Sequence, residues 1–160
     1  AQYGLEHIMT DGRLVITRLN RTMVATLEGS IDAGALEALV ESMSEFQARH
    51  LVDSVVFEVS ACEVMDIDEF AQLQKAVRTV EWLGLRSVIA GLRPGIVSYI
   101  VSSGAELGGL RTALDLELAL EELISDDNEE ELESQPDKDR DAEPESEPDV
   151  VGPVRHSYGS

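Results

Sequence analysis

The chain has 160 residues, and its 32 Asp and Glu against 12 Lys and Arg give a net charge of −20. This balance argues against nucleic acid or an anionic membrane as the main partner, because both require a basic surface. No apolar run approaches the roughly 18 residues that cross a membrane, and the first residues carry no secretory signal. The lone Cys62 excludes an internal disulfide, so we expect a cytoplasmic protein.

The charge divides the chain into two regions. Residues 126–160 contain 13 acids, three bases and four of the five prolines. Such a segment buries too little apolar surface to offset its chain entropy, so we expect a disordered acidic tail. That tail is either a solvating extension or a competitor for a basic surface on a partner. Residues 12–125 have the apolar content of a folded domain, and residues 1–11 form an N-terminal extension.

The folded region opens with a hairpin. Two β-branched runs, 14–16 and 23–27, flank Asn20-Arg21, where a tight turn is needed. Asp32 is placed to cap a helix that reaches His50, because its carboxylate can accept free backbone N–H groups. Apolar residues then recur with helical spacing at Leu36, Leu39, Val40, Met43 and Phe46.

Strands and helices alternate through the rest of the folded region. The pattern predicts strands at 54–59, 87–90 and 110–114 and helices at 96–101 and 115–124. Between the first two of these strands it predicts an amphipathic helix that carries Phe70, Leu73, Val77 and Val80 and ends at Gly84. Alternation of this kind indicates an α/β fold with a mixed, mostly parallel sheet, helices packed on it, and an antiparallel edge from the hairpin.

The sequence contains no recognisable catalytic motif. Phosphate-binding glycine loops, a Gly-x-Ser-x-Gly turn and metal-ligand spacings are all missing. The best catalytic candidate is an acidic cluster after the third strand, made of Glu63, Asp66, Asp68 and Glu69. Carboxylates bind Mg²⁺ or perform acid/base chemistry, but acids also stabilise the first turn of a helix, and this second role is favoured. We expect no catalytic residues, no metal and no cofactor.

Two large or reactive side chains have alternative interpretations. Cys62 is expected to be a small, half-buried hydrophobe rather than a redox sensor. Trp82, in the last turn of the second helix, is expected to pack against the sheet, with a partner anchor as the alternative. Lys75, Arg78 and Arg86 are expected to solvate an outer face rather than to bind an anion.

Four segments form a recognisable combination: the hairpin, Glu28–Asp32, the Val56–Val59 strand with Met65-Asp66, and Leu83–Ile96 with its Gly-Leu-Arg-Pro-Gly turn. Together they resemble one family, the STAS domain of sulfate transporters and anti-sigma-factor antagonists. The last of these segments is similar to the stressosome branch, and Thr112–Leu116 completes the pattern. The resemblance covers residues 12–124.

The resemblance implies a bacterial regulatory protein without enzymatic activity. STAS proteins of this branch assemble with STAS paralogues into a large scaffold and dock a serine/threonine switch kinase, or bind an anti-sigma factor. The kinase phosphorylates a Ser or Thr at the start of the second helix and is then released. The implied role is therefore in stress-response signalling through protein–protein contacts.

The sequence departs from the family at the phosphoacceptor. In the family the acceptor directly follows an Asp, and counting back from Gly84 places this pair on Asp66 and Ile67. Ile67 has no hydroxyl, while Asp68 and Glu69 supply permanent negative charge beside it. A second family acceptor falls near Tyr99, with Ser98 beside it. The hypothesis is a non-switching STAS protein that mimics the modified state or serves as a scaffold.

The expected contact surface combines the turn before the second helix with the Arg-Pro turn, and consists of Cys62, Glu63, Asp66, Asp68, Glu69, Arg93 and Pro94. A STAS module that binds a small apolar ligand is the first alternative. A Mg²⁺-dependent enzyme or phosphatase with an acidic pocket is the second.

Overall fold

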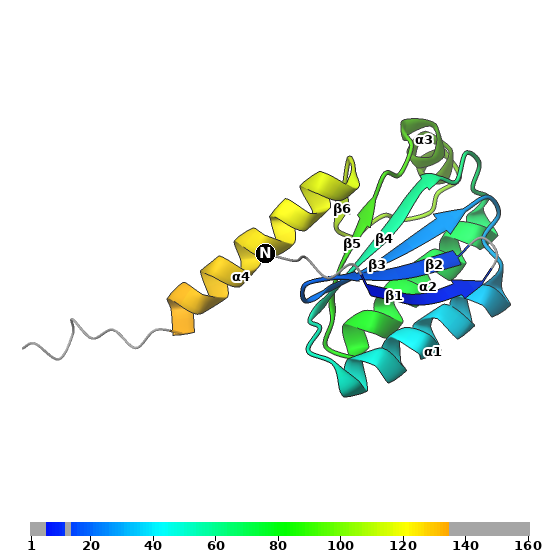
Figure 1. Cartoon of the computed structure of the whole chain (residues 1–160). Coiled ribbons are helices and arrows are strands. Elements are labelled where there is room, and N and C mark those ends of the chain that lie inside the picture. Colours follow the sequence, from blue (N-terminus) through cyan, green and yellow to red (C-terminus); the bar gives the residue numbers. More distant parts are fainter. Residues whose placement is uncertain (1–5, 12–13, 135–160) are drawn as a thin grey trace, which may run out of the picture. The chain divides into compact units, whose positions relative to one another are not determined.

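The computed structural model describes residues 6–11 and 14–134. Strands and helices follow one another along these residues (Figure 1). The strands are β1 (Glu6–Asp11), β2 (Leu14–Leu19), β3 (Thr22–Glu28), β4 (Ser54–Ala61), β5 (Arg86–Ala90) and β6 (Thr112–Ala113). The helices are α1 (Ala33–Arg49), α2 (Ile67–Trp82), α3 (Pro94–Ser102) and α4 (Leu116–Ser134).

All of these strands belong to one sheet, in which they lie in chain order from β1 to β6. The pairs β1–β2 and β2–β3 are antiparallel, whereas β3–β4, β4–β5 and β5–β6 are parallel. A helix lies in each parallel connection, because parallel neighbours need a crossover. The predicted α/β fold with a mixed, mostly parallel sheet and an N-terminal hairpin is confirmed.

Local sequence signals set the turns and helix ends. Asn20, in the β2–β3 turn, has a φ of +56°, a conformation that asparagine tolerates better than most residues. The Asp32 carboxylate accepts the Gly34 N–H at 3.2 Å and caps α1. Gly84 has a φ of +86° directly after α2, where a glycine ends a helix without the steric cost of a Cβ.

Alternation along β4 divides the buried core into two layers. On the face covered by α1 and α2 (Figure 1), Phe57 lies in one cluster with Leu39, Met43, Phe70 and Leu73. On the opposite face, Val56 belongs to a smaller cluster with Val24, Val88, Ala119 and Leu123. The first turns of α4 therefore cover the face that α1 and α2 leave open.

Two elements at the ends of the fold differ from the prediction. Residues 6–11, assigned to an N-terminal extension, form β1 and pair with β2. This strand depends on the free backbone groups of the β2 edge rather than on its own short pattern. At the other end, the last strand shortens from 110–114 to Thr112–Ala113, because it pairs only with Ile89 and Ala90 of β5.

Helix α4 continues to Ser134, beyond the predicted end at Ile124. Residues 126–134 contain neither Pro nor Gly and four Glu, a residue that favours helices. The chain divides into two units after Ser125, so the boundary falls inside this helix. The remainder of the predicted acidic tail, 135–160, lies outside the described residues.

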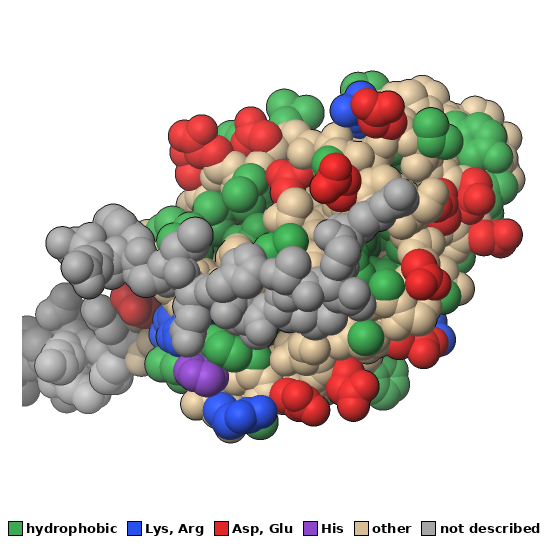
Figure 2. Space-filling model, turned by 45° about the vertical axis from the view of Figure 1, so that its right-hand side comes forward, with side chains coloured by type: hydrophobic (Ala, Val, Ile, Leu, Met, Phe, Trp, Pro, Cys, Tyr) green, Lys and Arg blue, Asp and Glu red, His purple; other side chains and the backbone are tan. Residues whose placement is uncertain are grey.

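Acidic side chains are scattered over the face shown in Figure 2, with basic side chains at its edges. Among the described side chains of this face, the basic groups lie apart from one another.

Candidate functional site

The turn between β4 and α2 is organised by a capping box. Asp66 is the N-cap of α2, and its Oδ1 accepts the Glu69 N–H at 2.7 Å. Glu69 returns the contact, since its Oε2 accepts the Asp66 N–H at 2.9 Å. The two carboxylates thus satisfy backbone groups that the first helical turn leaves free. Both acids have the helix-start role that the sequence favours.

Glu69 also joins this turn to the loop between β3 and α1. Its second oxygen, Oε1, accepts the backbone N–H of Ile31 at 3.1 Å. Ile31 is buried in the main core, so the bond fixes the start of α2 against an anchored segment. One carboxylate therefore holds two loops at the carboxyl end of the parallel strands, the edge where α/β proteins place their sites.

Arg93 fixes the neighbouring turn to the end of β4. Its Nε and Nη2 both donate to the carbonyl oxygen of Ser60, at 3.2 and 3.1 Å. Gly91, two residues earlier, has a φ of +78°, and a Cβ there would lie 2.8 Å from the Ser60 Cβ. The Arg-Pro turn can approach β4 this closely because position 91 has no side chain.

A pocket of about 410 Å³ lies between the β4–α2 turn and α3. It brings together Glu63, Asp66 and Arg93 of the predicted contact surface and Tyr99, the predicted second regulatory position. Pro94 and Ser98 are exposed nearby on α3 but do not line the pocket. Four lining residues were missed from the sequence, namely Val64, Met65, Gly95 and Ile96. Val64 is an apolar residue in an acidic turn, and this pattern is a sequence signal from which its place in the pocket could have been predicted.

Apolar side chains are exposed around this pocket. Val64 is 78% exposed, Tyr99 50% and Ile67 39%. Exposed apolar side chains that gather at one site are typical of a protein or ligand contact. Ile67 is the first residue of α2, directly after Asp66, so the position expected for the phosphoacceptor lies beside the pocket and carries no hydroxyl. Asp68 is exposed next to it.

Cys62 does not belong to the contact surface, contrary to the sequence prediction. Its side chain is fully buried in the main core, and its Sγ lies 3.6 Å from the Leu27 carbonyl oxygen. Burial, together with the negative charges of Glu69, Glu58 and Glu28, raises the pKa of Cys62 from 9.0 to about 11. A buried thiol that keeps its proton is a packing residue rather than a redox sensor.

Trp82 also differs from its prediction, but in the opposite direction, because it is exposed rather than buried. It was expected to pack against the sheet, but it is 92% exposed at the end of α2. The helical periodicity explains the difference, because Phe70, Leu73, Val77 and Val80 form the buried face of α2 and Trp82 lies off it.

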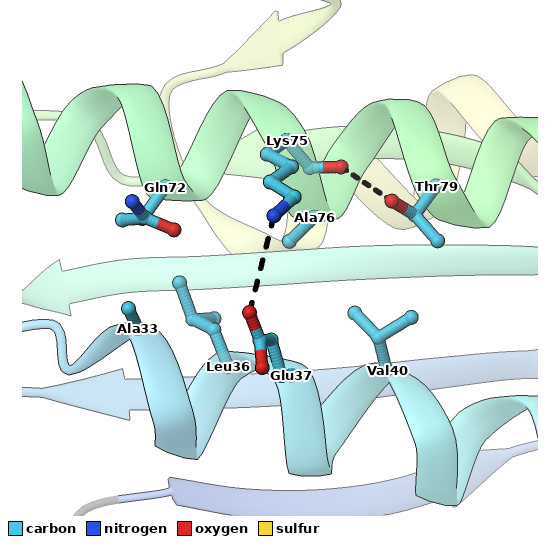
Figure 3. A pocket seen from close by; sticks show the side chains of 8 residues that line it. All are labelled: Ala33, Leu36, Glu37, Val40, Gln72, Lys75, Ala76 and Thr79. Atoms are coloured by element: carbon cyan, nitrogen blue, oxygen red, sulfur yellow. Dashed lines mark hydrogen bonds and ion pairs between the residues drawn. The ribbon is translucent and has the colours of Figure 1, made fainter.

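A second, smaller hollow of about 250 Å³ separates α1 from α2 (Figure 3). Leu36 and Val40 project into it from α1 and Ala76 from α2, while a Lys75–Glu37 ion pair of 3.9 Å spans it. The hollow is a groove between two packed helices and shares no lining residue with the pocket beside the acidic turn.

The acids of the site do not form a metal centre. Within residues 14–134, no group of three or more His, Cys, Asp or Glu side chains is placed to hold a metal ion. Asp66 and Glu69 already accept hydrogen bonds from backbone N–H groups.

In the part of the chain that the structure describes, no helix has the length and apolar character needed to cross a membrane.

The sequence profile of one family, described as the STAS domain, matches residues 13–117. The chain belongs to the STAS domain family. Two curated relatives are named RsbT co-antagonist proteins, RsbRB and RsbRD of Bacillus subtilis (strain 168). RsbRB is 26% identical over 106 residues, and RsbRD is 25% identical over 97. The matches cover 66% and 61% of this chain but only 38% and 35% of the relatives, so this STAS chain spans little more than a third of their length.

Solved structures of other proteins have the same fold as this chain. An RsbS variant of Moorella thermoacetica, with one serine replaced by glutamate, superposes with a TM-score of 0.61 at 26% identity, over 73% of this chain and 99% of that one. A chain from a structure described as the molecular architecture of the stressosome, a signal integration and transduction hub, gives 0.56 at 24% identity, over 69% and 96%. The family resemblance read from the sequence is thereby confirmed.

Proposed function

We propose that this STAS protein is a regulatory scaffold subunit that docks a serine/threonine switch kinase, or an anti-sigma factor, without being phosphorylated at the usual position. Its docking surface is the pocket between the β4–α2 turn and α3 with its rim: Glu63, Val64, Asp66, Ile67, Asp68, Glu69, Arg93, Pro94 and Tyr99. The names of the relatives, co-antagonists and a stressosome component, support this class of role. We propose a cytoplasmic location and assembly with STAS paralogues.

The single observation that carries the proposal is the chemistry of position 67. The start of α2 has an intact N-cap at Asp66 and an exposed first residue, yet that residue is Ile67. Phosphate requires a hydroxyl, which isoleucine does not have. The neighbouring Asp68 and Glu69 give the helix start fixed negative charge, part of what a phosphate would add.

Adding a hydroxyl at position 67 tests both parts of the proposal. The full chain, Ile67→Thr and the matched control Ile67→Val are incubated with the switch kinase of the same organism and ATP, and binding and phosphate transfer are measured. Threonine and valine have nearly the same shape, so only the hydroxyl differs. We expect all three to bind the kinase and Ile67→Thr alone to take up stoichiometric phosphate on the turn.

Two results would contradict the proposal. Phosphate on the unmodified chain anywhere in residues 60–70, where Ser60 is the available hydroxyl, would show that the switch is intact. Absence of kinase and anti-sigma-factor binding by all three proteins would remove the docking role. Light scattering of the chain mixed with STAS paralogues tests the scaffold part separately.

The pocket also supports a second candidate function, binding of a small apolar ligand. Its volume of about 410 Å³ falls within the roughly 300–1,000 Å³ of ordinary ligand pockets. A thermal-shift screen separates the two functions, since a ligand that binds the pocket raises the melting temperature and Val64→Glu abolishes the shift. The hydrogen-bonded state of Asp66 and Glu69 gives no support to the alternative of a Mg²⁺-dependent enzyme.

A further inference from the structure

The outer face of α2 carries an apolar and basic surface that runs from Ala71 to Trp82. Ala71, Lys75, Arg78 and Trp82 follow one another at spacings of four, three and four residues, so they lie along one side of the helix. A hollow of about 480 Å³ runs along them and is also lined by Gln74 and Thr79. We call these six residues the Trp82 surface.

Trp82 is the lone tryptophan of the chain and is 92% exposed. Tryptophan is among the residues that most often carry the binding energy of a protein interface. At this position it contributes nothing to the core, so its exposure indicates a contact surface.

The charges of the Trp82 surface are positive in a chain with a net charge of −20. Arg78 makes no hydrogen bond or ion pair with any residue in the described part of the chain. Lys75 meets Glu37 of α1 at 3.9 Å, but both side chains are largely exposed, and such pairs contribute little. The surface therefore fits an acidic partner that also presents an apolar side chain.

The chain itself contains a segment of this chemistry. Residues 128–134 of α4 are exposed and include Glu129, Glu130, Glu131 and Glu133 with no base. Leu132 among them is 70% exposed, and Glu129 precedes it by three residues on the same side of the helix. Leu132 can contact Trp82, and the glutamates can pair with Arg78 and Lys75. The segment is therefore complementary to the Trp82 surface.

We propose that the Trp82 surface binds the acidic 128–134 segment of a second copy of this chain, so that two copies exchange these segments. The inference does not depend on the proposed function, because the docking surface surrounds the start of α2 and shares no residue with the Trp82 surface, which runs from Ala71 to Trp82. Overall repulsion between two acidic chains does not prevent it at about 0.1 M salt, where charges more than about 10 Å apart are largely screened.

Sedimentation and Trp82 fluorescence of the full chain test the proposal. At about 0.1 M salt we expect the average mass to rise above that of the monomer with concentration, and the Trp82 emission to shift to shorter wavelength. Both changes should reverse at about 1 M salt, where the screening length falls to about 3 Å. Arg78→Glu should abolish both, whereas the control Arg49→Glu, an equal charge change on α1, should leave them intact.

A charge exchange distinguishes a second copy from other occupants. Arg78→Glu and the double variant Glu129→Arg/Glu130→Arg should each remain monomeric, but their mixture should associate, because each surface then meets an opposite charge. A monomeric chain under all conditions would overturn the proposal. A salt-sensitive Trp82 emission that is independent of concentration and not restored by mixing would overturn it as well.

Discussion

The guanidinium of Arg93 donates two hydrogen bonds to the carbonyl oxygen of Ser60, 3.2 Å from Nε and 3.1 Å from Nη2. The bonds join the turn before α3 to the last residues of β4, immediately before the acidic turn. Arg93 therefore holds together the two segments between which the 410 Å³ pocket lies. An arginine that the sequence suggests only as a partner contact also has a structural role.

Replacing Arg93 should lower the stability of the fold slightly and should disturb the arrangement of the pocket more. We expect Arg93→Ala to lower the free energy of unfolding by about 1 kcal/mol, a typical net value for hydrogen bonds at an exposed site. Arg93→Lys should recover little, because an ammonium cannot reproduce the fork of the guanidinium. Urea denaturation measures the change. Arg49→Ala, which breaks no bond within the described residues, should stay within about 0.5 kcal/mol, and an equal loss there would contradict the role of Arg93.

Gly91 is required by both its conformation and its neighbours. A Cβ at this position would lie 2.8 Å from the Ser60 Cβ and 3.0 Å from Glu58 Oε1. We expect Gly91→Ala to cost about 3 kcal/mol or more, the sum of the left-handed backbone and an overpacked contact. Gly84→Ala is the matched control, since its φ is +86° and nothing lies within 4 Å of the added Cβ. It should cost only about 1–2 kcal/mol, and equal losses in denaturant would show that the contact with Ser60 is unimportant.

The capping box at the start of α2 should depend on the acceptor at position 66 rather than on its charge. We expect Asp66→Ala to lower the free energy of unfolding by about 1 kcal/mol, whereas Asp66→Asn, which still accepts a hydrogen bond, should lose much less. Thermal or urea unfolding of the two variants provides the measurement. If Asn were as damaging as Ala, the carboxylate charge beside the helix start would be the dominant contribution.

Cys62 should make stability depend on pH in the alkaline range. Its pKa is raised from 9.0 to about 11, so the folded chain retains a proton that the unfolded chain releases first. The free energy of unfolding should therefore keep its full value below pH 9 and fall as the pH rises toward 11. Comparing urea midpoints of the unmodified chain and Cys62→Ala across this range isolates the thiol, because other alkaline groups titrate in both. Parallel curves would argue against the shift.

Thiol labelling gives a second measurement at Cys62. Because the side chain is fully buried, a thiol reagent at mildly alkaline pH should react slowly with the native chain and at once in denaturant. Rapid native labelling would mean that the β4–α2 turn opens often enough to expose the core.

The alternating pattern of strands and helices was sufficient to predict the fold class. Asn20, Asp32 and Gly84 have the turn and capping positions that their chemistry predicts, because these preferences act within a few residues. Strand β1 was not predicted, because its formation depends on pairing with the edge of β2 rather than on a pattern in its own sequence. Helix α4 runs to Ser134 because a glutamate-rich segment without proline favours the helix despite its charge.

At the site, the sequence by itself determined which groups are present: an acidic turn, an arginine-proline turn, and an isoleucine where a hydroxyl was expected. Only the tertiary structure decided how they are used. It buried Cys62 and exposed Trp82, tied Glu69 to Ile31 and Arg93 to Ser60, and opened a pocket beside Ile67. The reason is physical: helix ends and turns depend on neighbours in the chain, whereas burial and bonds between loops depend on packing between residues that are far apart in it.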